Sequence, residues 1–198
     1  MIKSFSFSES EIINNCLQLY TEGTFDCDLT YGLGNIYKSS PDPVHKFDIN
    51  PSSPDVIKHD FAQCLGLKLY RSIVFDPPFF ATNHIIMKRF GSYPNIECLL
   101  QSYSKAIYNI SLQLKDRGNL FFKCQDVTNG KRNFILHSWI ISECLKHNMI
   151  CLDIFILLSK NRFTNLSVAQ SHSRKFHCYW IVFKKLSPGD IKKVKHLI

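Results

Sequence analysis

Residues 72–79 read Ser-Ile-Val-Phe-Asp-Pro-Pro-Phe, a short apolar run that stops at an acid and two prolines. Such a run is typical of a buried parallel strand. Neither proline can continue a strand ladder or enter a helix interior, so the chain after Phe75 is predicted to form a stiff turn. This turn would point the Asp76 carboxylate and the Pro77 carbonyl into a cleft, and Phe79 would offer a ring for stacking. Two acceptors and a ring together suit the exocyclic amino group of a flat base.

Length and composition predict one soluble domain. The chain has 198 residues, of which 45% are hydrophobic and 20% charged, as in ordinary globular proteins. No apolar run approaches the roughly 18 residues of a membrane span, and the N-terminus lacks the pattern of a secretory signal. The eight cysteines are scattered without a C-x-x-C pair. We therefore expect reduced cysteines, no metal site, no membrane association and a cytoplasmic location.

The charge is concentrated near the C-terminus. Residues 1–158 hold 15 Lys and Arg against 15 Asp and Glu, whereas residues 159–198 hold 9 against 1. The last fifth of the chain thus carries the whole formal charge of +8. A neutral body with a basic end predicts a polyanionic partner held near that end. For the final run, residues 192–195, a solubilising tail is an equally good interpretation.

The first part of the chain predicts a helix and three short strands. Residues 8–20 have helical apolar spacing and end before Gly23. Strands are expected at residues 24–28, 46–51 and 56–60. Asp28-Leu-Thr-Tyr-Gly-Leu-Gly34 follows the first of these, and its two glycines would let backbone amides approach a ligand closely.

Two acids end the second and third of these strands. In a doubly wound sheet, such acids face one crevice and accept hydrogen bonds from ribose hydroxyls and an adenine amino group. Asp48 would suit the ribose and Asp60 the adenine, with Phe61 beside it. Ordinary strand-end turns are the alternative interpretation of each acid alone. Too few residues separate these strands for the usual crossover helix, so either that helix is absent or one acid lies elsewhere.

The second half of the chain predicts alternating helices and strands. Residues 81–93 form a loop over the site, serving as a lid or a DNA contact. The elements expected after it are a helix from Pro94 to about Arg117 with Gly118 as its stop, a strand at 119–124, a polar loop at 125–132, a helix at 133–147, a strand at 150–158, a basic connection at 159–175 and an antiparallel strand at 176–183.

The Asp76-Pro77-Pro78-Phe79 motif resembles the D-P-P-[YF] signature of S-adenosylmethionine-dependent amino methyltransferases that act on adenine N6 or cytosine N4. The segment from Asp28 to Gly34 is similar to the D-P-F-x-G-x-G cofactor loop of these enzymes, with Leu and Thr in place of Pro and Phe. Residues 122–126 and 170–177 are similar in style to small bacterial and phage methylases of this group. The resemblance covers about residues 24–185.

This resemblance implies a Rossmann-like class I methyltransferase, an α/β fold whose mostly parallel, seven-stranded sheet has an antiparallel last strand. We expect a single methyltransferase domain over residues 1–198, with an N-terminal helix (1–23), a catalytic core (24–185) and a basic tail (186–198). The implied cofactor is S-adenosylmethionine, and the implied setting is the cytoplasm of a bacterium or a phage-infected cell.

The expected reaction is methyl transfer to an exocyclic amino group of a DNA base that is flipped out or already single-stranded. The expected catalytic residues are Asp76, Pro77, Pro78 and Phe79; the cofactor residues Asp28, Tyr31, Gly32, Gly34, Asp48, Asp60 and Phe61; and the nucleic-acid residues Lys88, Arg89, Lys160, Arg162, Arg174 and Lys175. An RNA base methyltransferase, or a non-catalytic DNA-binding or anti-restriction protein on the same scaffold, remains the alternative. A second subunit, in a homodimer, is one source of further base contacts.

Overall fold

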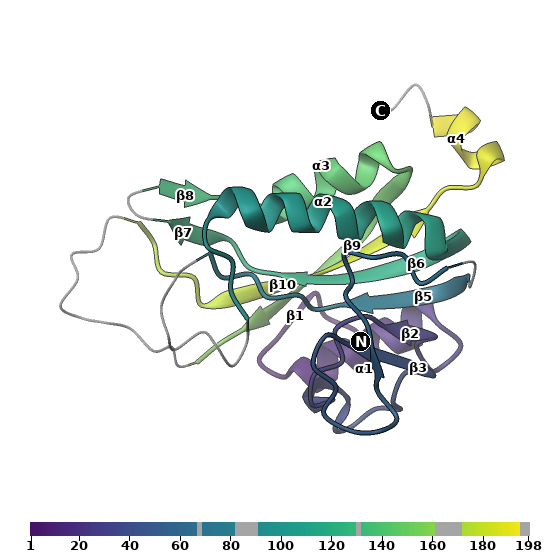
Figure 1. Cartoon of the computed structure of the whole chain (residues 1–198), viewed down its shortest axis with the longest axis horizontal. Coiled ribbons are helices and arrows are strands. Elements are labelled where there is room, and N and C mark those ends of the chain that lie inside the picture. Colours follow the sequence, from purple (N-terminus) through teal and green to yellow (C-terminus); the bar gives the residue numbers. More distant parts are fainter. Residues whose placement is uncertain (67–68, 82–90, 130–131, 161–171, 195–198) are drawn as a thin grey trace.

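The computed structural model describes residues 1–66, 69–81, 91–129, 132–160 and 172–194 (Figure 1). Within them lies an eight-stranded sheet in the order β1-β9-β10-β6-β5-β2-β3-β4. Its strands are β1 (Phe5–Ser6), β2 (Cys27–Asp28), β3 (His45–Asp48), β4 (Ile57–Lys58), β5 (Tyr70–Phe75), β6 (Leu114–Cys124), β9 (Met149–Leu158) and β10 (His177–Lys185). The helices are α1 (Glu9–Tyr20), the 3-10 turn η1 (Asn35–Tyr37), α2 (Ile96–Gln113), α3 (Leu136–Lys146) and α4 (Pro188–Val194).

All neighbouring strands of this sheet pair in parallel except β10, which is antiparallel to both β6 and β9. The predicted α/β class and the antiparallel last strand are therefore confirmed. The sheet has eight strands where seven were expected, because the short strand β1 pairs with β9 through Phe5 and Ile156. Two residues are too few to show an alternating pattern, so this strand could not be predicted from the residue pattern.

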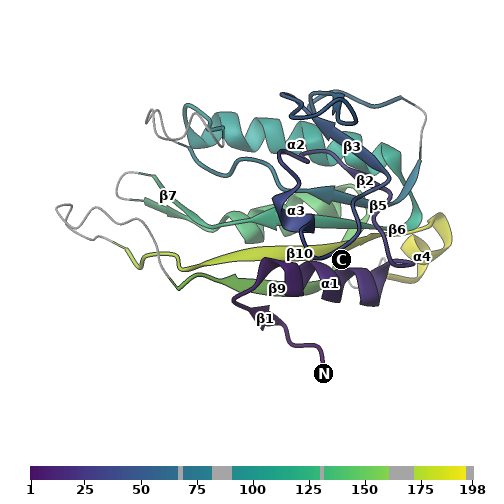
Figure 2. The ribbon, with the colours of Figure 1, turned by 90° about the horizontal axis from the view of Figure 1, so that it is seen from below.

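Helices cover both faces of the sheet, as Figure 2 shows with α1 on one side and α2 on the other. The side chains of β5 alternate between the two faces. Val74 is buried in the cluster that contains the apolar side of α1. Its neighbours Ile73 and Phe75 belong to the cluster beneath α2 and α3. The central strand is thus buried on both faces, as its continuous apolar run predicted.

Strands β3 and β4 are joined without a helix. Phe47 pairs in parallel with Ile57, and residues 49–56 make the connection. Parallel strands usually need a crossover of about a dozen residues or more. Of the two alternatives, the absent helix is the correct one, and both acids lie at or just beyond the ends of their strands.

The predicted end of the long helix is wrong. Asn95 caps α2 by accepting from the Cys98 amide at 2.8 Å, but the helix ends at Gln113 and the chain passes directly into β6. Leu114 fits the helical apolar spacing equally well, so periodicity could not separate the two elements. Gly118 is no helix stop, because it lies within β6. A Cβ at this position would lie 3.0 Å from the Arg71 carbonyl oxygen. The glycine allows β5 and β6 to approach closely.

Two smaller boundaries also differ from the prediction. The segment expected to be a polar loop contains a separate two-stranded hairpin, formed by β7 (Val127–Asn129) and β8 (Arg132–Phe134). The following helix α3 consequently begins at Leu136 rather than at residue 133.

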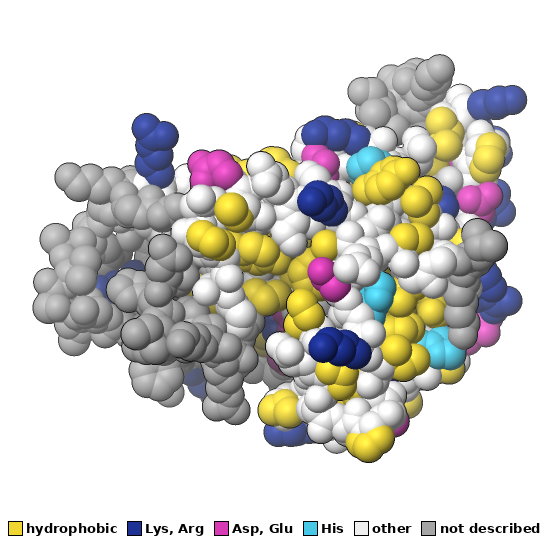
Figure 3. All heavy atoms as spheres, viewed as in Figure 1, with side chains coloured by type: hydrophobic (Ala, Val, Ile, Leu, Met, Phe, Trp, Pro, Cys, Tyr) yellow, Lys and Arg dark blue, Asp and Glu magenta, His cyan; other side chains and the backbone are white. Residues whose placement is uncertain are grey.

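In the view of Figure 3, hydrophobic side chains lie in several separate groups among basic, acidic and polar ones. Across the described residues, no helix combines the length and the hydropathy needed to cross a membrane. None of the eight cysteines, all within the described part, is in a disulfide.

Candidate active site

The glycine loop, residues 28–34, begins at a buried carboxylate. Asp28 ends β2, and one of its oxygens accepts from the Thr30 amide at 2.7 Å and from the Thr30 hydroxyl at 3.2 Å. The other oxygen accepts from the Tyr37 hydroxyl at 2.6 Å. Burial raises the pKa of Asp28 to about 7, although these hydrogen bonds act in the opposite direction. The buried Asp28 carboxylate therefore fixes the conformation of the glycine loop through these hydrogen bonds.

Both predicted glycines adopt left-handed backbone conformations, with φ of 60° at Gly32 and 66° at Gly34. A methyl group on Gly34 would overlap the Tyr31 ring and hydroxyl. The Gly32 amide donates to Asp48 Oδ2 at 2.8 Å, and the Ser52 hydroxyl donates to the Gly32 carbonyl at 2.6 Å. The structure thus brings the acid that ends β3 into direct contact with the glycine loop.

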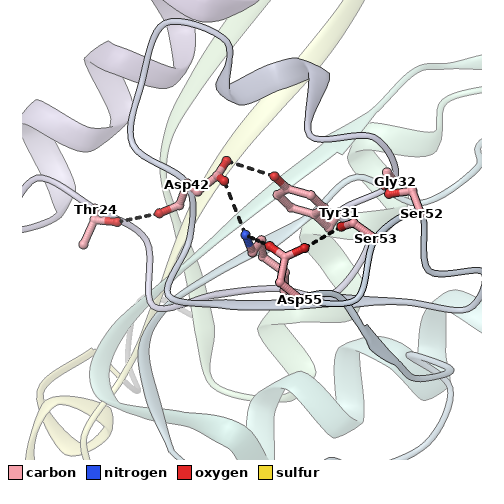
Figure 4. A network of polar contacts seen from close by, with 8 residues as sticks. Thr24, Tyr31, Gly32, Asp42, Ser52, Ser53 and Asp55 are labelled. Carbon is pink, nitrogen blue, oxygen red and sulfur yellow. Dashed lines mark hydrogen bonds and ion pairs between the residues drawn. The ribbon is translucent and has the colours of Figure 1, made fainter.

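A polar network holds the outer side of this loop (Figure 4). The Tyr31 hydroxyl donates to Asp42 at 2.9 Å, and the Tyr31 ring stacks on Tyr37 with centroids 5.7 Å apart. The Lys46 ammonium pairs with Asp42 at 3.4 Å and with Asp55. The hydrogen bond to Asp55 is the largest cause of a raised Lys46 pKa. Asp42 and Asp55 were not predicted from the sequence, because each lies in a connection rather than at a strand end.

Asp60, the third acid of the predicted cofactor site, lies near the central strand β5. Asp60 follows β4, and its Oδ1 accepts from the Ala62 amide at 2.9 Å. The next residue, Phe61, packs its ring against Phe75 in a T-shaped contact with centroids 5.0 Å apart. The predicted adenine segment is therefore adjacent to the last residue of β5.

The Asp76-Pro77-Pro78-Phe79 segment follows β5 directly, as predicted. The Asp76 amide donates to the Thr30 hydroxyl at 2.7 Å, which ties this segment to the glycine loop. The Pro78 carbonyl accepts from the Tyr103 hydroxyl of α2 at 2.9 Å. Phe79 packs against Phe80, with centroids 4.9 Å apart. The expected catalytic segment and the expected cofactor loop thus meet at the carboxyl edge of the sheet.

A buried lysine that the sequence analysis missed lies beside Asp76. Lys123 Nζ is 2.9 Å from Asp76 Oδ2 and 2.7 Å from Glu9 Oε1, and the Trp180 indole donates to the same Glu9 oxygen at 3.2 Å. Burial lowers the Lys123 pKa, but the two carboxylates raise it far more, so the ammonium is charged. Burial raises the pKa of Asp76, and Lys123 opposes that rise. The sequence feature that could have indicated this buried lysine is its place within the apolar run Leu-Phe-Phe-Lys-Cys, residues 120–124.

A second polar cluster, which the sequence analysis did not single out, lies at the same edge. His137 Nδ1 is 2.7 Å from Asp126 Oδ1, and the Tyr179 hydroxyl donates to Asp126 Oδ2 at 3.4 Å. The His137 and Tyr179 rings lie with centroids 4.3 Å apart. Burial is the largest cause that raises the Tyr179 pKa to about 12. This cluster joins the segment after β6 to the start of β10.

Of the expected nucleic-acid residues, Lys88, Arg89 and Arg162 lie outside the described part of the chain. Lys160, Arg174 and Lys175 lie where β9 ends and β10 begins, which is the same edge as Asp76. A surface hollow at the opposite edge is lined by Arg71, Lys115, Asn119 and others, but by none of the predicted site residues. The described residues contain no group of three or more His, Cys, Asp or Glu that could hold a metal ion.

No family model matches this chain, and no curated protein gives a significant match. Solved structures do match. The N-methyltransferase NodS from Bradyrhizobium japonicum, in complex with S-adenosylhomocysteine, is 12% identical and aligns over 90% of this chain and 86% of its own, with a TM-score of 0.52. An S-adenosylmethionine-dependent methyltransferase from Clostridium acetobutylicum is 12% identical over 92% of this chain and 93% of its own, with a TM-score of 0.53.

A candidate DNA modification methylase from Thermus thermophilus is 16% identical over 72% of this chain, with a TM-score of 0.46. The present chain spans only about half of that protein, 55% of its length. This similarity is too low to support an inference about substrate. The NodS and Clostridium structures show that the present chain has the Rossmann-like class I methyltransferase fold.

Proposed function

We propose that this protein transfers a methyl group from S-adenosylmethionine to an exocyclic amino nitrogen of a nucleic-acid base, adenine N6 or cytosine N4 in DNA. The observation that carries the proposal is the contact between the Asp76 amide and the Thr30 hydroxyl, which joins the catalytic motif to the glycine loop. The proteins of similar fold whose names specify a cofactor use S-adenosylmethionine or were solved with its product.

The residues at the carboxyl edge fit this cofactor. Asp48 contacts the glycine loop and, like any carboxylate, has further acceptor capacity for ribose hydroxyls. Asp60 and Phe61 offer an acceptor and a ring for the adenine. Asp28 is fully buried, so we assign it to fixing the loop rather than to touching the cofactor. When bound, the cofactor supplies an electron-poor methyl group on a sulfonium.

Asp76 would hold the target amine. Lys123 donates to Asp76 Oδ2 and favours the ionised carboxylate, and within the described part of the chain no residue donates to Oδ1. Oδ1 would accept from an amino hydrogen and so direct the nitrogen lone pair toward the methyl group. The amino nitrogen would become acidic only as it is methylated, so a weak acceptor such as Asp76 would suffice to take its proton, and the cofactor would leave as S-adenosylhomocysteine. Orientation supplies much of the rate acceleration.

The target base must leave the helical stack to reach Asp76, because a paired amino group lies inside the duplex. Phe79 would stack on the extruded base. Lys160, Arg174 and Lys175 would hold flanking phosphates, together with Lys88, Arg89 and Arg162 of the remaining basic segments. The overall charge of +8 supports such a partner.

The test combines nucleoside mass analysis with calorimetry. Single-stranded DNA, duplex DNA and RNA are each incubated with the protein and isotope-labelled cofactor, and we expect label in N6-methyladenine or N4-methylcytosine from DNA. Asp76→Ala should abolish transfer and leave cofactor affinity within a few-fold. Asp116→Ala, which removes an exposed acid of β6, is the matched control.

Label in RNA alone would replace the DNA assignment with the RNA one. Absence of cofactor binding by calorimetry would favour the non-catalytic scaffold. Full turnover by a folded Asp76→Ala protein would remove Asp76 from the mechanism.

A further inference from the structure

The N-terminal helix α1 brings a second carboxylate, that of Glu9, to the candidate active site. Glu9 lies in the first turn of α1, where the amino end of a helix favours negative charge. Its Oε1 lies 2.7 Å from Lys123 Nζ and accepts from the Trp180 indole at 3.2 Å. The buried side of α1 belongs to the same apolar cluster as Val74 and Trp180. Packing of α1 on the sheet therefore fixes Glu9 beside Lys123.

Lys123 contacts two carboxylates, so the three charged groups are not balanced. Its Nζ is 2.7 Å from Glu9 and 2.9 Å from Asp76, and all three side chains are mostly buried. When all are ionised, two carboxylates and one ammonium leave one excess negative charge. A proton on Asp76 removes this excess and leaves Glu9 and Lys123 as a balanced pair. Without Glu9, the same proton would leave Lys123 as a buried charge with no ionised partner, which is costly.

The electrostatics of Asp76 agree with this arrangement. Burial is the largest cause that raises the pKa of Asp76, Lys123 lowers it, and Glu9 raises it. A like charge nearby makes a carboxylate a better proton acceptor. Among the described residues, the other titratable groups that interact electrostatically with Asp76 are Asp28, Tyr37, Tyr103 and Cys124. All four are kept in the variants below, so they do not account for differences among them.

We propose that Glu9 is a positioning residue, which balances the charge of Lys123 and so keeps Asp76 able to accept a proton. The inference rests on the proposed function for the source of that proton, the amino nitrogen of the target base as it is methylated. The proton moves from this nitrogen to the Asp76 carboxylate and later to water. The excess negative charge of the three groups is thereby lost and then restored. Glu9 acts through Lys123 rather than by touching the base.

The test follows the Asp76 carboxyl by carbon-13 NMR titration of the full chain without added ligand, and its signal is identified by its absence from Asp76→Asn. Asp76 should titrate at lower pH in Glu9→Gln than in the wild type, because a like charge is removed, and at higher pH in Lys123→Met. Methyl transfer to single-stranded DNA at pH 7 should fall about tenfold in Glu9→Gln, part of the roughly 10²- to 10⁴-fold that a positioned proton acceptor contributes. Glu9→Asp, which keeps the charge, should recover most of that rate.

Glu11→Gln is the matched control, because Glu11 lies in the same helical turn but accepts from the Ser6 hydroxyl at 2.5 Å. It loses the same charge and should change neither the Asp76 titration nor transfer. An Asp76 titration in Glu9→Gln equal to that of the wild type would overturn the inference, as would a shifted titration with undiminished transfer. If the wild type transfers no methyl group, the proposed function fails. The titrations then decide the inference alone: opposite shifts in Glu9→Gln and Lys123→Met support it, and unchanged ones overturn it.

Discussion

Replacing Lys123 with methionine tests the buried ion pairs beside the candidate active site. The substitution keeps the length of the side chain but removes the ammonium that contacts both Asp76 and Glu9. Lys123 is 13% exposed and Asp76 20%, so water compensates only partly for the lost partner. Breaking a buried pair costs about 3–5 kcal/mol in the free energy of unfolding, and the partial exposure leads us to expect about 2–4 kcal/mol at pH 7.

The cost should depend on pH in a defined direction. Burial raises the pKa of Asp76 above its ordinary value of 3.8, and Lys123 limits that rise. In Lys123→Met this limit is gone, so the Asp76 pKa rises further and the folded state favours the protonated acid. A group of this kind contributes stability at low pH that is lost as pH rises through its folded pKa. We therefore expect a small deficit near pH 4 and the full deficit near pH 7.

Urea denaturation of the wild type and Lys123→Met from pH 4 to pH 8 measures the loss in the free energy of unfolding and its dependence on pH. The control is Lys146→Met, because Lys146 also pairs with an acid, Glu143, but its side chain is 63% exposed. Exposed pairs contribute about 0–1 kcal/mol, so this control should be nearly neutral. A Lys123→Met deficit below 1 kcal/mol, or one that does not change with pH, would refute the reasoning.

Three further predictions test separate parts of the protein. Asp28 has a pKa of about 7 against an ordinary 3.8, so its ionisation removes about 4 kcal/mol of stability as pH rises from 4 to 7; in Asp28→Asn, denaturation should show this dependence lost. Asp48→Ala and Asp60→Ala should each weaken cofactor binding by about 1–3 kcal/mol in calorimetry, and normal binding by both would remove the acids from the cofactor site. Arg174→Ala with Lys175→Ala should lower the slope of log affinity against log salt for DNA by about two, whereas an unchanged slope would move the phosphate contacts elsewhere.

Local signals in the sequence located the central strand and its end. The apolar run of residues 72–75 followed by an acid and two prolines is compatible with few structures other than a buried strand that stops abruptly. By contrast, Leu114 continues the apolar spacing of α2 and also begins β6, so one pattern fitted two elements. What ends the helix is pairing with Tyr70 of β5, a contact between distant parts of the chain. No local pattern encodes such a contact.

The residues of the candidate site also divide into those that local sequence signals predict and those that depend on contacts between distant parts of the chain. Glycines and strand-end acids could be found by position, and the structure brings Gly32 and Asp48 together. Lys123 and Glu9 could not be paired from sequence, because more than a hundred residues separate them and α1 must first pack on the sheet. Asp28 could be found as the first residue of the glycine loop, but spacing alone does not reveal that Thr30 and Tyr37 donate hydrogen bonds to its carboxylate.

The missing crossover helix explains why the outer side of the glycine loop depends on polar contacts. In a helix-covered sheet, apolar packing would fix the end of β3, whereas here residues 49–56 make a short connection. Lys46 with Asp42 and Asp55 holds that connection, and Ser52 ties it to Gly32. Exposed ion pairs of this kind weaken as salt screens them, while the two-sided core around β5 does not. Because Asp48 lies beside these ion pairs, high salt should loosen the part of the site expected to bind the cofactor before it affects β5, the strand that precedes Asp76.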